Sequence, residues 1–512
     1  MLLLPALATA FVPLTPSYVN NHKAFSVSSK QKPPSSYLSV EQVAQKDAGS
    51  EDDSSSSTST STPATVTLDQ GSTFIFSDPN EEAFYVNADI GSSQYPLLID
   101  TGSPYLWVYD SDCDDGSCDN KPLYSVSPSQ TSTTTSTFEL AYNTGTASGV
   151  LVEDDVTIAD CTAKNFSFGA ASSVPDIFQN YSFSGILGLS ANATVADPSG
   201  KNGRELDNIV DYLHKKGSID AGKFALCMGK YPVTPDNGNA GLLLLGDTTA
   251  NQQGLYLDPV YEASILNDSS NHWEVKIDEV FVDNYQASFQ PLDVGGTSSN
   301  TSRIGLLDSG TTSIILSSKD AMTLHSYFPA SISDGTQYAV FCNSTLTVSL
   351  QIAGHNWTIT PSQYLGQPYG ADSSLDGYCV SNFQGLDSTR DGSWILGNIF
   401  LRKYYVEFDY DHAKVGLAER NAGAVVLLAT TVEGNTLPAS SPTSSAGSSY
   451  YNVSYSLTST QSRPQPTSNS SSGFTATSNS SSTTSISKGG AGNFLPSWTS
   501  LIPLLLTALY LL

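Results

Sequence analysis

Two aspartates in this sequence stand in the same local setting. Asp100 and Asp308 each follow a short apolar run, and each begins a turn of hydroxyl and glycine residues. The apolar runs read as buried strands, so each turn places a carboxyl group at a strand end. The turn residues are Thr101, Gly102 and Ser103 after Asp100, and Ser309, Gly310 and Thr311 after Asp308.

Two carboxyl groups that share one site can catalyse hydrolysis. Ionising both groups is energetically unfavourable, so one holds a proton while the other is charged, and the pair titrates as a unit. The charged member can take a proton from a water molecule, and the protonated member can polarise the carbonyl group under attack. Hydroxyls at Ser103 and Thr311, with N–H groups at Gly102 and Gly310, would stabilise the anion. The alternative is a pair of ordinary Asx turns at strand ends.

The surroundings of the two aspartates are repeated as well. Ile186, within a Gly-Ile-Leu-Gly run, follows Asp100 by 86 residues, and Ile395, within a Trp-Ile-Leu-Gly run, follows Asp308 by 87. This spacing indicates an internal duplication and argues against unrelated Asx turns. A two-fold arrangement of the halves would bring both turns to one axis.

The elements that must position these turns are mostly strands. Between Thr65 and about Ala418, short apolar runs alternate with Gly, Asn, Asp and Ser clusters, which predicts an all-β body. Helical periodicity is rare, with Glu205 to Lys216 the best candidate. The 512 residues exceed one core, and we expect an N-terminal lobe at 67–258 and a C-terminal lobe at 259–420.

Composition and motifs exclude several other functions. The formal net charge of -27 argues against nucleic acid as a partner. The histidines are scattered, and no His-Glu-x-x-His, Cys-x-x-Cys or Gly-x-Ser-x-Gly motif is present, so zinc and serine-hydrolase chemistry lack their residues. The acidic run from Asp110 to Gly116 fails the EF-hand pattern, because Asp115 and Lys121 stand where Gly and Glu are needed. We expect no metal and no cofactor.

The N-terminal region predicts secretion and processing. Residues 1–19 resemble a signal peptide, although a disordered apolar segment is the alternative. Residues 20–66 begin with a lysine-rich leader and end in a Ser/Thr tract. A basic leader before an acidic body suggests a propeptide clamped over the carboxylates, followed by an exposed linker; a merely solvated leader is the alternative.

The rest of the chain carries further secretory features. Residues 421–489 are rich in Ser and Thr and predict a glycosylated stalk. Residues 490–512 end in an apolar run too short to span a bilayer comfortably. They resemble a removed GPI-attachment signal with Gly489 or Gly490 as the attachment site, the alternatives being a transmembrane anchor or none. Glycosylation sequons in the globular part are at Asn165, Asn180, Asn192, Asn267, Asn300, Asn343 and Asn356.

Residues 70 to 420 resemble the pepsin-like aspartic proteases. Beside the two Asp turns, residues 138–145 (Phe-Glu-Leu-Ala-Tyr-Asn-Thr-Gly) resemble the flap of that family. Residues 394–397, 408–409 and 415–418 resemble the run that closes its C-terminal lobe. The resemblance implies a bilobal fold of two β-rich lobes, related by a pseudo-two-fold axis, with the active-site cleft between them.

The resemblance also implies roles for single residues. Thr101 and Ser309 would hydrogen-bond across the two turns. Tyr142, with Thr144 and Gly145, would belong to a substrate-covering flap. Trp107 would hydrogen-bond Tyr142 or simply fill the core. The implied disulfides are Cys113–Cys118 and Cys342–Cys379, which leaves Cys161 and Cys227 to pair with each other or stay free.

Our interpretation is a secreted aspartic endopeptidase that uses an Asp100/Asp308 pair and a Tyr142 flap. It would be a monomer that acts on proteins or peptides, tethered to the plasma membrane or cell wall by a GPI anchor, and similar in layout to fungal yapsin-like proteases. The alternative is an inactive pepsin-fold binding or cell-wall structural glycoprotein. Asn143, Ser184 and Asn398 depart from the common family pattern, which affects subsite shape rather than class.

Overall fold

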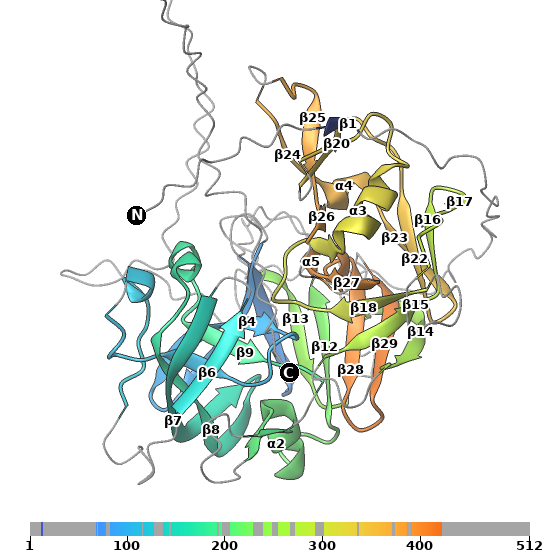
Figure 1. Cartoon of the computed structure of the whole chain (residues 1–512). Helices are drawn as coiled ribbons and strands as arrows, with labels where there is room; N and C mark the ends of the chain where they lie inside the picture. Colours follow the sequence, from blue (N-terminus) through green and yellow to red (C-terminus); the bar gives the residue numbers. More distant parts are fainter. Residues whose placement is uncertain are drawn as a thin grey trace, which may run out of the picture. The chain divides into compact units, whose positions relative to one another are not determined.

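In the computed structural model, all of the described residues belong to one of the two units into which the chain divides. The described residues are 12–13, 68, 70–77, 82–114, 116–126, 137–142, 145–191, 194–196, 205–228, 239–247, 254–266, 272–291, 302–334, 337–370, 374–386, 389 and 392–421. Apart from residues 12–13 and 421, the predicted signal peptide, propeptide, stalk and GPI-attachment signal lie outside them. Strands dominate this part of the chain (Figure 1), so the prediction of an all-β fold is confirmed.

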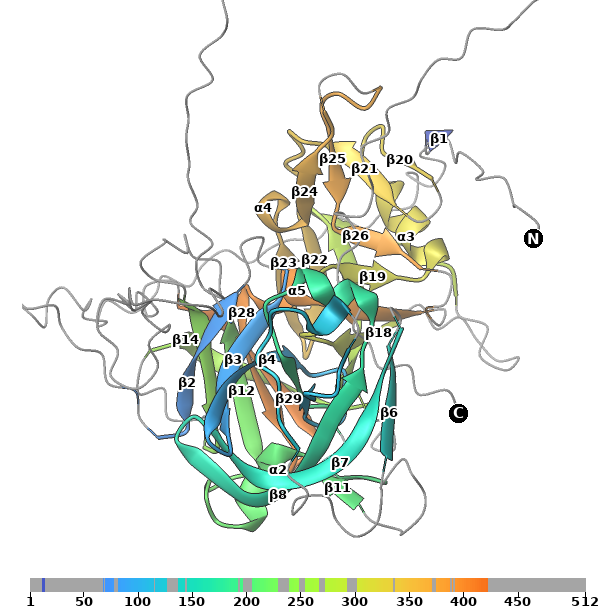
Figure 2. The same cartoon turned by 90° about the vertical axis from the view of Figure 1, so that its left-hand side faces the viewer.

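The largest sheet has thirteen strands. In sheet order they are β14 (Tyr256–Ser264), β29 (Lys414–Arg420), β28 (Tyr404–Asp409), β12 (Lys223–Met228), β13 (Asn239–Leu245), β2 (Ser72–Ser77), β3 (Phe84–Ile90), β4 (Ser93–Asp100), β9 (Gly185–Gly188), β5 (Trp107–Tyr109), β8 (Cys161–Ser173), β7 (Gly145–Ile158) and β6 (Thr137–Tyr142). Figure 2 shows the long strands β7 and β8 curving past helix α2 (Ile209–Lys215). Two register shifts in this pair account for the curvature, because bulges increase strand twist.

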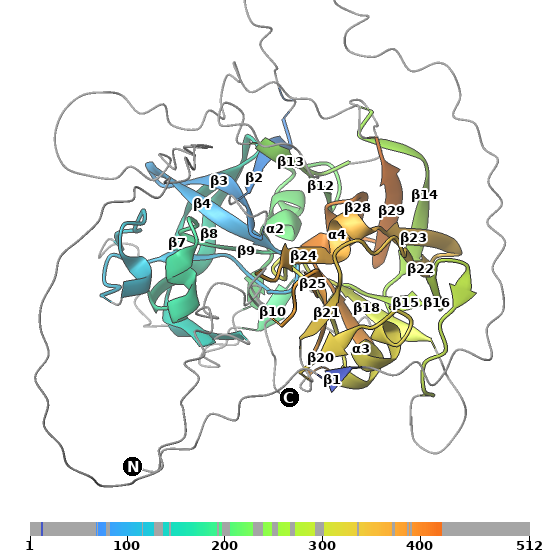
Figure 3. The same ribbon diagram turned by 90° about the horizontal axis from the view of Figure 1, so that it is seen from above.

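This sheet runs from the first half of the chain into the second. Strand β12 pairs antiparallel with β28, with Lys223 opposite Asp409 and Phe224 opposite Phe408, and Figure 3 shows the two strands side by side. Strand β14 spans the predicted lobe boundary at residues 258–259. Backbone hydrogen bonds therefore join the two halves directly.

Further sheets are built mostly from strands of the second half. The five-stranded sheet next to Asp308 contains β15 (Glu274–Ile277), β18 (Arg303–Leu307), β27 (Ser393–Leu396), β19 (Ile314–Leu316) and β26 (Phe383–Gly385). Another contains β1 (Val12–Pro13), β20 (Ile332–Ser333), β21 (Tyr338–Phe341), β25 (Tyr378–Ser381) and β24 (Leu365–Pro368), and a third contains β17 (Tyr285–Gln286), β16 (Glu279–Val282), β22 (Val348–Ile352) and β23 (His355–Ile359). Strands β10 (Thr194–Ala196) and β11 (Glu205–Asp207) form a separate pair.

Helices are few and short. Helix α2 begins later than the sequence predicts, because Glu205 starts β11 and Asn208 caps the helix by accepting from the Val210 N–H. Asparagine is favoured at this position because its side chain satisfies a free helical donor. The others are α3 (Ser318–His325), α4 (Pro361–Tyr364), α5 (Asn398–Leu401) and the 3-10 turns η1 (Gly116–Cys118) and η2 (Asp176–Asn180). Within the described part of the chain, no helix is long and apolar enough to cross a membrane.

The predicted duplication appears as a repeated strand arrangement. Strand β4 runs parallel to β9, and β18 runs parallel to β27. The strand that follows each aspartate turn pairs antiparallel with that parallel partner: β5 pairs with β9, and β19 pairs with β27. Each aspartate thus lies at the end of a strand that is hydrogen-bonded within a buried sheet.

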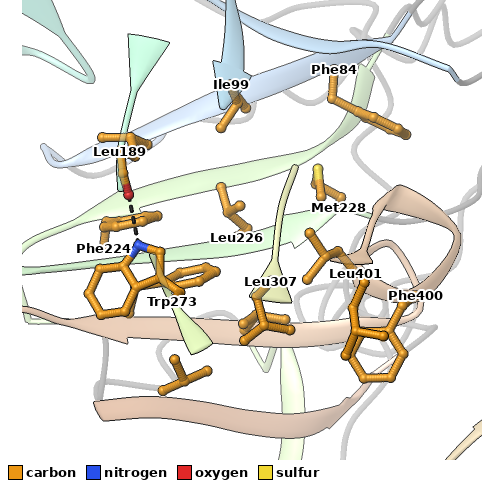
Figure 4. Packing of buried hydrophobic residues seen from close by; sticks show 14 of the residues in the cluster. Phe84, Ile99, Leu189, Phe224, Leu226, Met228, Trp273, Leu307, Phe400 and Leu401 are labelled. Atoms are coloured by element: carbon orange, nitrogen blue, oxygen red, sulfur yellow. Dashed lines mark hydrogen bonds between the residues drawn. The ribbon is translucent and has the colours of Figure 1, made fainter. Parts of the chain in front are cut away.

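A hydrophobic core lies beneath these strands and contains residues of both halves (Figure 4). Ile99 precedes Asp100 and Leu307 precedes Asp308, and both side chains are fully buried in this core. Side chains alternate along β12, so that Leu226 faces the same core while Cys227 faces a separate cluster. This burial stabilises the strand ends that hold the two turns.

Candidate active site

Both aspartates are fully buried and are held by their own turns in the same way. Asp100 is the last residue of β4, and its carboxylate accepts the Gly102 N–H at 2.9 Å and the Ser103 hydroxyl at 2.5 Å. Asp308 follows β18 directly. Its carboxylate accepts the Gly310 N–H at 2.9 Å and the Thr311 hydroxyl at 2.7 Å.

The two turns are also bonded to each other. The Thr101 hydroxyl donates to the Leu307 carbonyl at 2.8 Å and accepts the Ser309 N–H at 2.9 Å. The Ser309 hydroxyl donates to the Ile99 carbonyl at 2.8 Å and accepts the Thr101 N–H at 3.0 Å. The four bonds form a reciprocal set, which fixes one turn against the other.

The turn glycines bring the carboxyl groups into one site. A methyl group placed on Gly102 would lie 2.8 Å from Oδ1 of Asp308, and one placed on Gly310 would overlap Oδ1 of Asp100. Each glycine therefore lies against the carboxylate of the opposite half. Asp100 and Asp308 therefore lie close to each other.

Burial and proximity raise the pKa of both groups. Burial raises the pKa of Asp100 well above its usual value, and the neighbouring charge of Asp308 raises it further. Burial also raises the pKa of Asp308, although hydrogen bonds from Thr311 and Gly310 oppose this effect. The pair therefore binds a proton at pH values where an exposed aspartate has lost it.

Tyr142 lies at the end of a hairpin. Strands β6 and β7 are antiparallel, with Tyr142 opposite Gly145. The Trp107 indole Nε1 donates to the Tyr142 hydroxyl at 2.8 Å, and Trp107 itself is fully buried. The two interpretations of Trp107, hydrogen bonding and core filling, thus both apply. Thr144 and Asn143 lie outside the described residues.

Residues that the sequence reasoning missed support this hairpin. The Phe178 ring stacks on Trp107 at 6.2 Å and meets the edge of Tyr142 at 6.0 Å. The buried Lys121 ammonium donates to the Phe178 carbonyl at 2.5 Å and to the Tyr109 hydroxyl at 3.2 Å. The sequence does not predict these contacts of Phe178, because η2 lies far from Trp107 along the chain.

Contacts between the halves next to the aspartates were also missed. The Thr312 hydroxyl donates to the Glu82 carbonyl at 2.9 Å. Asn398, one of the departures from the family pattern, donates through Nδ2 to the same carbonyl at 3.4 Å and to the Ser309 carbonyl at 3.1 Å. Trp273 donates to the Leu189 carbonyl at 2.8 Å. In all three residues the second half supplies the side-chain donor.

Cysteine pairing follows the resemblance in two cases and leaves two thiols free. Cys113–Cys118 and Cys342–Cys379 are disulfides. Cys161 and Cys227 are both buried and unbonded, so of the two alternatives that the sequence left open, the structure has free thiols. The reason is that they pack in different clusters, Cys161 in the large core and Cys227 on the opposite face of β12.

The sequons that fall on described residues lie near the surface. Asn165, Asn180 and Asn343 are exposed, and Asn356 is half-buried in β23. Asn192, Asn267 and Asn300 lie outside the described residues. No group of three or more His, Cys, Asp or Glu side chains in the described ranges could hold a metal ion.

Comparisons with known proteins give relatives of one kind. A family model described as eukaryotic aspartyl protease matches residues 83–420. The chain is 27% identical over 327 residues to the "Probable aspartic-type endopeptidase CTSD" of Arthroderma otae, which covers 64% of this chain and 78% of that protein. It is 28% identical over 394 residues to the "Aspartic-type endopeptidase ctsD" of Aspergillus fumigatus, covering 76% and 74%. It is 30% identical over 331 residues to "Cathepsin E-B" of Xenopus laevis, covering 63% and 75%.

Proposed function

This chain belongs to the eukaryotic aspartyl protease family, and from that premise we propose that Asp100 and Asp308 are the catalytic pair of an aspartic endopeptidase. One observation carries the proposal. Two fully buried carboxyl groups are each held by an N–H and a hydroxyl of their own turn, and the turns are joined by reciprocal bonds between Thr101 and Ser309.

The chemistry follows from one shared proton. The ionised carboxylate takes a proton from a water molecule, which attacks the carbonyl carbon of the peptide bond. The protonated carboxyl group donates a hydrogen bond to the carbonyl oxygen, so that a tetrahedral intermediate forms without a covalent bond to the enzyme. Because the donors in both turns are fixed in advance, little reorganisation is needed as charge moves.

The pKa directions determine the pH dependence. Catalysis needs one proton on the pair, and burial raises the pKa values of both carboxyl groups. Activity should therefore be lost as the pH rises and the second proton leaves. The contribution of the pair to the free energy of unfolding also decreases as the pH rises. The reason is that the folded state binds more protons than the unfolded chain once the pH exceeds the ordinary aspartate pKa.

We assign the β6–β7 hairpin as the flap over a bound peptide. The hydrogen bond from Trp107 and the Phe178 ring hold Tyr142 in a single position. A hairpin that closes over the substrate would exclude bulk water from the reacting bond. Gly145 and Tyr142 would then lie near the substrate.

The tethering of the enzyme is a separate part of the proposal. The propeptide, stalk and GPI signal fall outside the described residues and rest on sequence patterns alone. Release of activity from cells by phosphatidylinositol-specific phospholipase would support a GPI-anchored, surface-located protease of the yapsin-like kind. Activity that stays with the cells after this treatment, on a protein that retains residues 490–512, would contradict it.

The test of the catalytic pair is substitution of each aspartate by asparagine. We expect Asp100→Asn and Asp308→Asn each to reduce peptide cleavage at acidic pH by at least about 10³-fold, because neither amide can take a proton from water. Pepstatin, an inhibitor of aspartic proteases, should block the unaltered protein. Secretion yield and circular dichroism should stay unchanged. Cleavage that persists in either variant would overturn the mechanism, and a well-folded unaltered protein with no activity would favour the binding or structural glycoprotein.

A further inference from the structure

Trp273 lies where the two halves of the molecule meet. It is fully buried and immediately precedes β15. Its indole packs at 6.2 Å from the Phe224 ring of β12 and at 5.1 Å from the Phe408 ring of β28. These strands are the pair that joins the halves, and their two phenylalanines stack at 4.6 Å. Figure 4 shows the indole beside Phe224, with its nitrogen directed towards Leu189.

The side chain of Trp273 is linked to the first aspartate through Leu189. Its Nε1 donates to the Leu189 carbonyl at 2.8 Å, drawn as the dashed line in Figure 4. The Leu189 N–H in turn donates to the Asp100 carbonyl at 2.8 Å. One residue thus separates the indole from the backbone of Asp100.

The main chain of Trp273 reaches the second aspartate. Its carbonyl accepts the Leu307 N–H at 3.1 Å. Leu307 is the last residue of β18 and directly precedes Asp308. Trp273 is therefore linked to Asp100 through its side chain and Leu189, and it is hydrogen-bonded through its backbone to the residue that precedes Asp308.

We propose that Trp273 is a positioning residue for the catalytic pair, which sets the separation of the Asp100 and Asp308 carboxyl groups by bridging the segments that carry them. This inference rests on the proposed function. The Thr101 and Ser309 hydroxyls join the turns on the side of the carboxylates, and Trp273 connects the segments behind the turns on the side of the core. Without Trp273 the turns would stay linked by hydrogen bonds, but the strands behind them could shift.

Only tryptophan meets both requirements of the position. Its ring packs against the stacked pair of Phe224 and Phe408, and its N–H satisfies a buried main-chain carbonyl, which is costly to leave unpaired. Phenylalanine fills most of the space but cannot donate. A displacement of about 1 Å at the reacting groups can reduce a rate about 100-fold, so a small shift of the strands is sufficient to affect catalysis.

The separation of the carboxyl groups should also appear in the pH profile. The groups that act on the Asp100 pKa in addition to burial are the Asp308 carboxyl, the Ser103 hydroxyl and the Gly102 N–H. The repulsion between the two carboxylates decreases as their distance increases. Wider separation would therefore let the second proton leave at a lower pH.

Trp357 provides a matched control. It is also fully buried, and its Nε1 donates to a main-chain carbonyl, that of Ile352, at 3.1 Å. That bond lies within the β22–β23 hairpin and contacts neither aspartate turn. Trp357→Phe removes the same atoms and the same kind of bond as Trp273→Phe, and it should lower the melting temperature similarly.

The experiment compares both variants of the full secreted chain on one fluorogenic peptide that the unaltered protein cleaves, with active sites counted by pepstatin titration. For Trp273→Phe we expect kcat to fall about 10-fold or more while KM changes less than about threefold, with the alkaline limb moved to lower pH. Trp357→Phe should keep the kcat and pH limb of the unaltered protein.

Equal kcat values and equal pH limbs for the two variants would overturn the inference and leave Trp273 a core residue. If Trp273→Phe is not secreted, Phe408→Leu takes its place, because it loosens the packing of the indole but removes no hydrogen-bond donor. It should lower kcat and move the alkaline limb of the pH profile to lower pH, as expected for Trp273→Phe. Phe400→Leu is the control for this variant. Unchanged values in Phe408→Leu would then refute the proposal. Activity retained by Asp100→Asn would instead refute the catalytic pair itself, so the two failures are distinguishable.

Discussion

Each aspartate is hydrogen-bonded by its own turn but confined by the glycine of the other turn. The Gly102 and Gly310 N–H groups stabilise the carboxylates of Asp100 and Asp308, two residues before them. Their missing side chains matter for a different reason, since each leaves the space that the opposite carboxylate occupies. The site therefore requires glycine on steric grounds as well as for its backbone donor.

We predict that Gly310→Ala strongly reduces catalysis without unfolding the protein. The added methyl group would overlap Oδ1 of Asp100, so the carboxylate must move away from its partner, and we expect kcat to fall about 100-fold or more. Gly370→Ala is the control, because a methyl group there meets nothing within 4 Å. Steady-state kinetics and melting temperature of both variants are the measurements. Unchanged kcat in Gly310→Ala would contradict the arrangement of the pair.

At the scale of single elements, helix α3 holds buried polar groups that support the second aspartate. Asp320 accepts from Arg303 at 2.6 Å and 2.8 Å and from the Trp394 indole at 2.8 Å. Arg303 begins β18, which ends just before Asp308, and Trp394 lies on its parallel partner β27. One carboxylate on α3 thus anchors both strands, and breaking this buried ion pair by removing one of its charges would destabilise the fold.

The same helix contains a group that should weaken the fold in acid. Burial lowers the pKa of His325 to about 3, and the ring stacks on Tyr338 at 3.9 Å and contacts the Ser381 hydroxyl at 2.9 Å. In the unfolded chain His325 binds a proton as the pH falls below about 6.5, whereas in the folded chain it does so only as the pH falls towards about 3. The free energy of unfolding should therefore decrease as the pH falls from about 6.5 towards about 3, by up to about 4 kcal/mol.

His325→Gln tests this prediction through the pH dependence of stability. The variant should be less stable at neutral pH, because it loses the stacking on Tyr338, but its stability should decrease less between about pH 6.5 and about pH 3. Urea unfolding across this range measures both effects. Parallel curves for the variant and the unaltered protein would show that His325 does not titrate as expected.

At the scale of the whole molecule, the β12–β28 pair carries charged residues across the junction of the halves. The Lys223 ammonium lies 2.9 Å from Asp409 and 3.3 Å from Glu407 on the neighbouring strand. Burial alone would raise the pKa of Asp409, but hydrogen bonds from Lys223 and His412 offset it and hold the pKa below the usual value. The pairing thus contributes stability above the ordinary aspartate pKa, which is lost as the pH falls through the lowered one.

We predict that Lys223→Met destabilises the junction by about 2–4 kcal/mol at neutral pH, because it removes the ammonium that two largely buried carboxylates share. The loss should decrease in acid as Asp409 becomes protonated. Lys414→Met is the control, since Lys414 pairs with Glu262 across β29 and β14 in an exposed position and should cost less than about 1 kcal/mol. Denaturant unfolding of both variants at neutral and at acidic pH measures these losses of stability. A Lys223→Met loss that matches the control would contradict the prediction.

The fold class and the two aspartate turns could be predicted from the sequence because their signals are local or repeated. An aspartate between an apolar run and a Thr-Gly or Ser-Gly turn is recognisable by itself, and the duplicated spacing to Ile186 and Ile395 places both copies in equivalent positions. Strand periodicity likewise depends on neighbouring residues. The boundaries of α2 and the fate of Cys161 and Cys227 were less accessible, because capping and packing across a strand decided them.

The tertiary structure alone decided how the halves are held together around the pair. Trp273 bonds to Leu189, 84 residues away, and Thr312 bonds to Glu82 across 230 residues. In each case the acceptor is a main-chain carbonyl, a group that every residue carries, so no residue type marks the partner in the sequence. Only the folded chain selects which of these carbonyls lies within reach of a given donor.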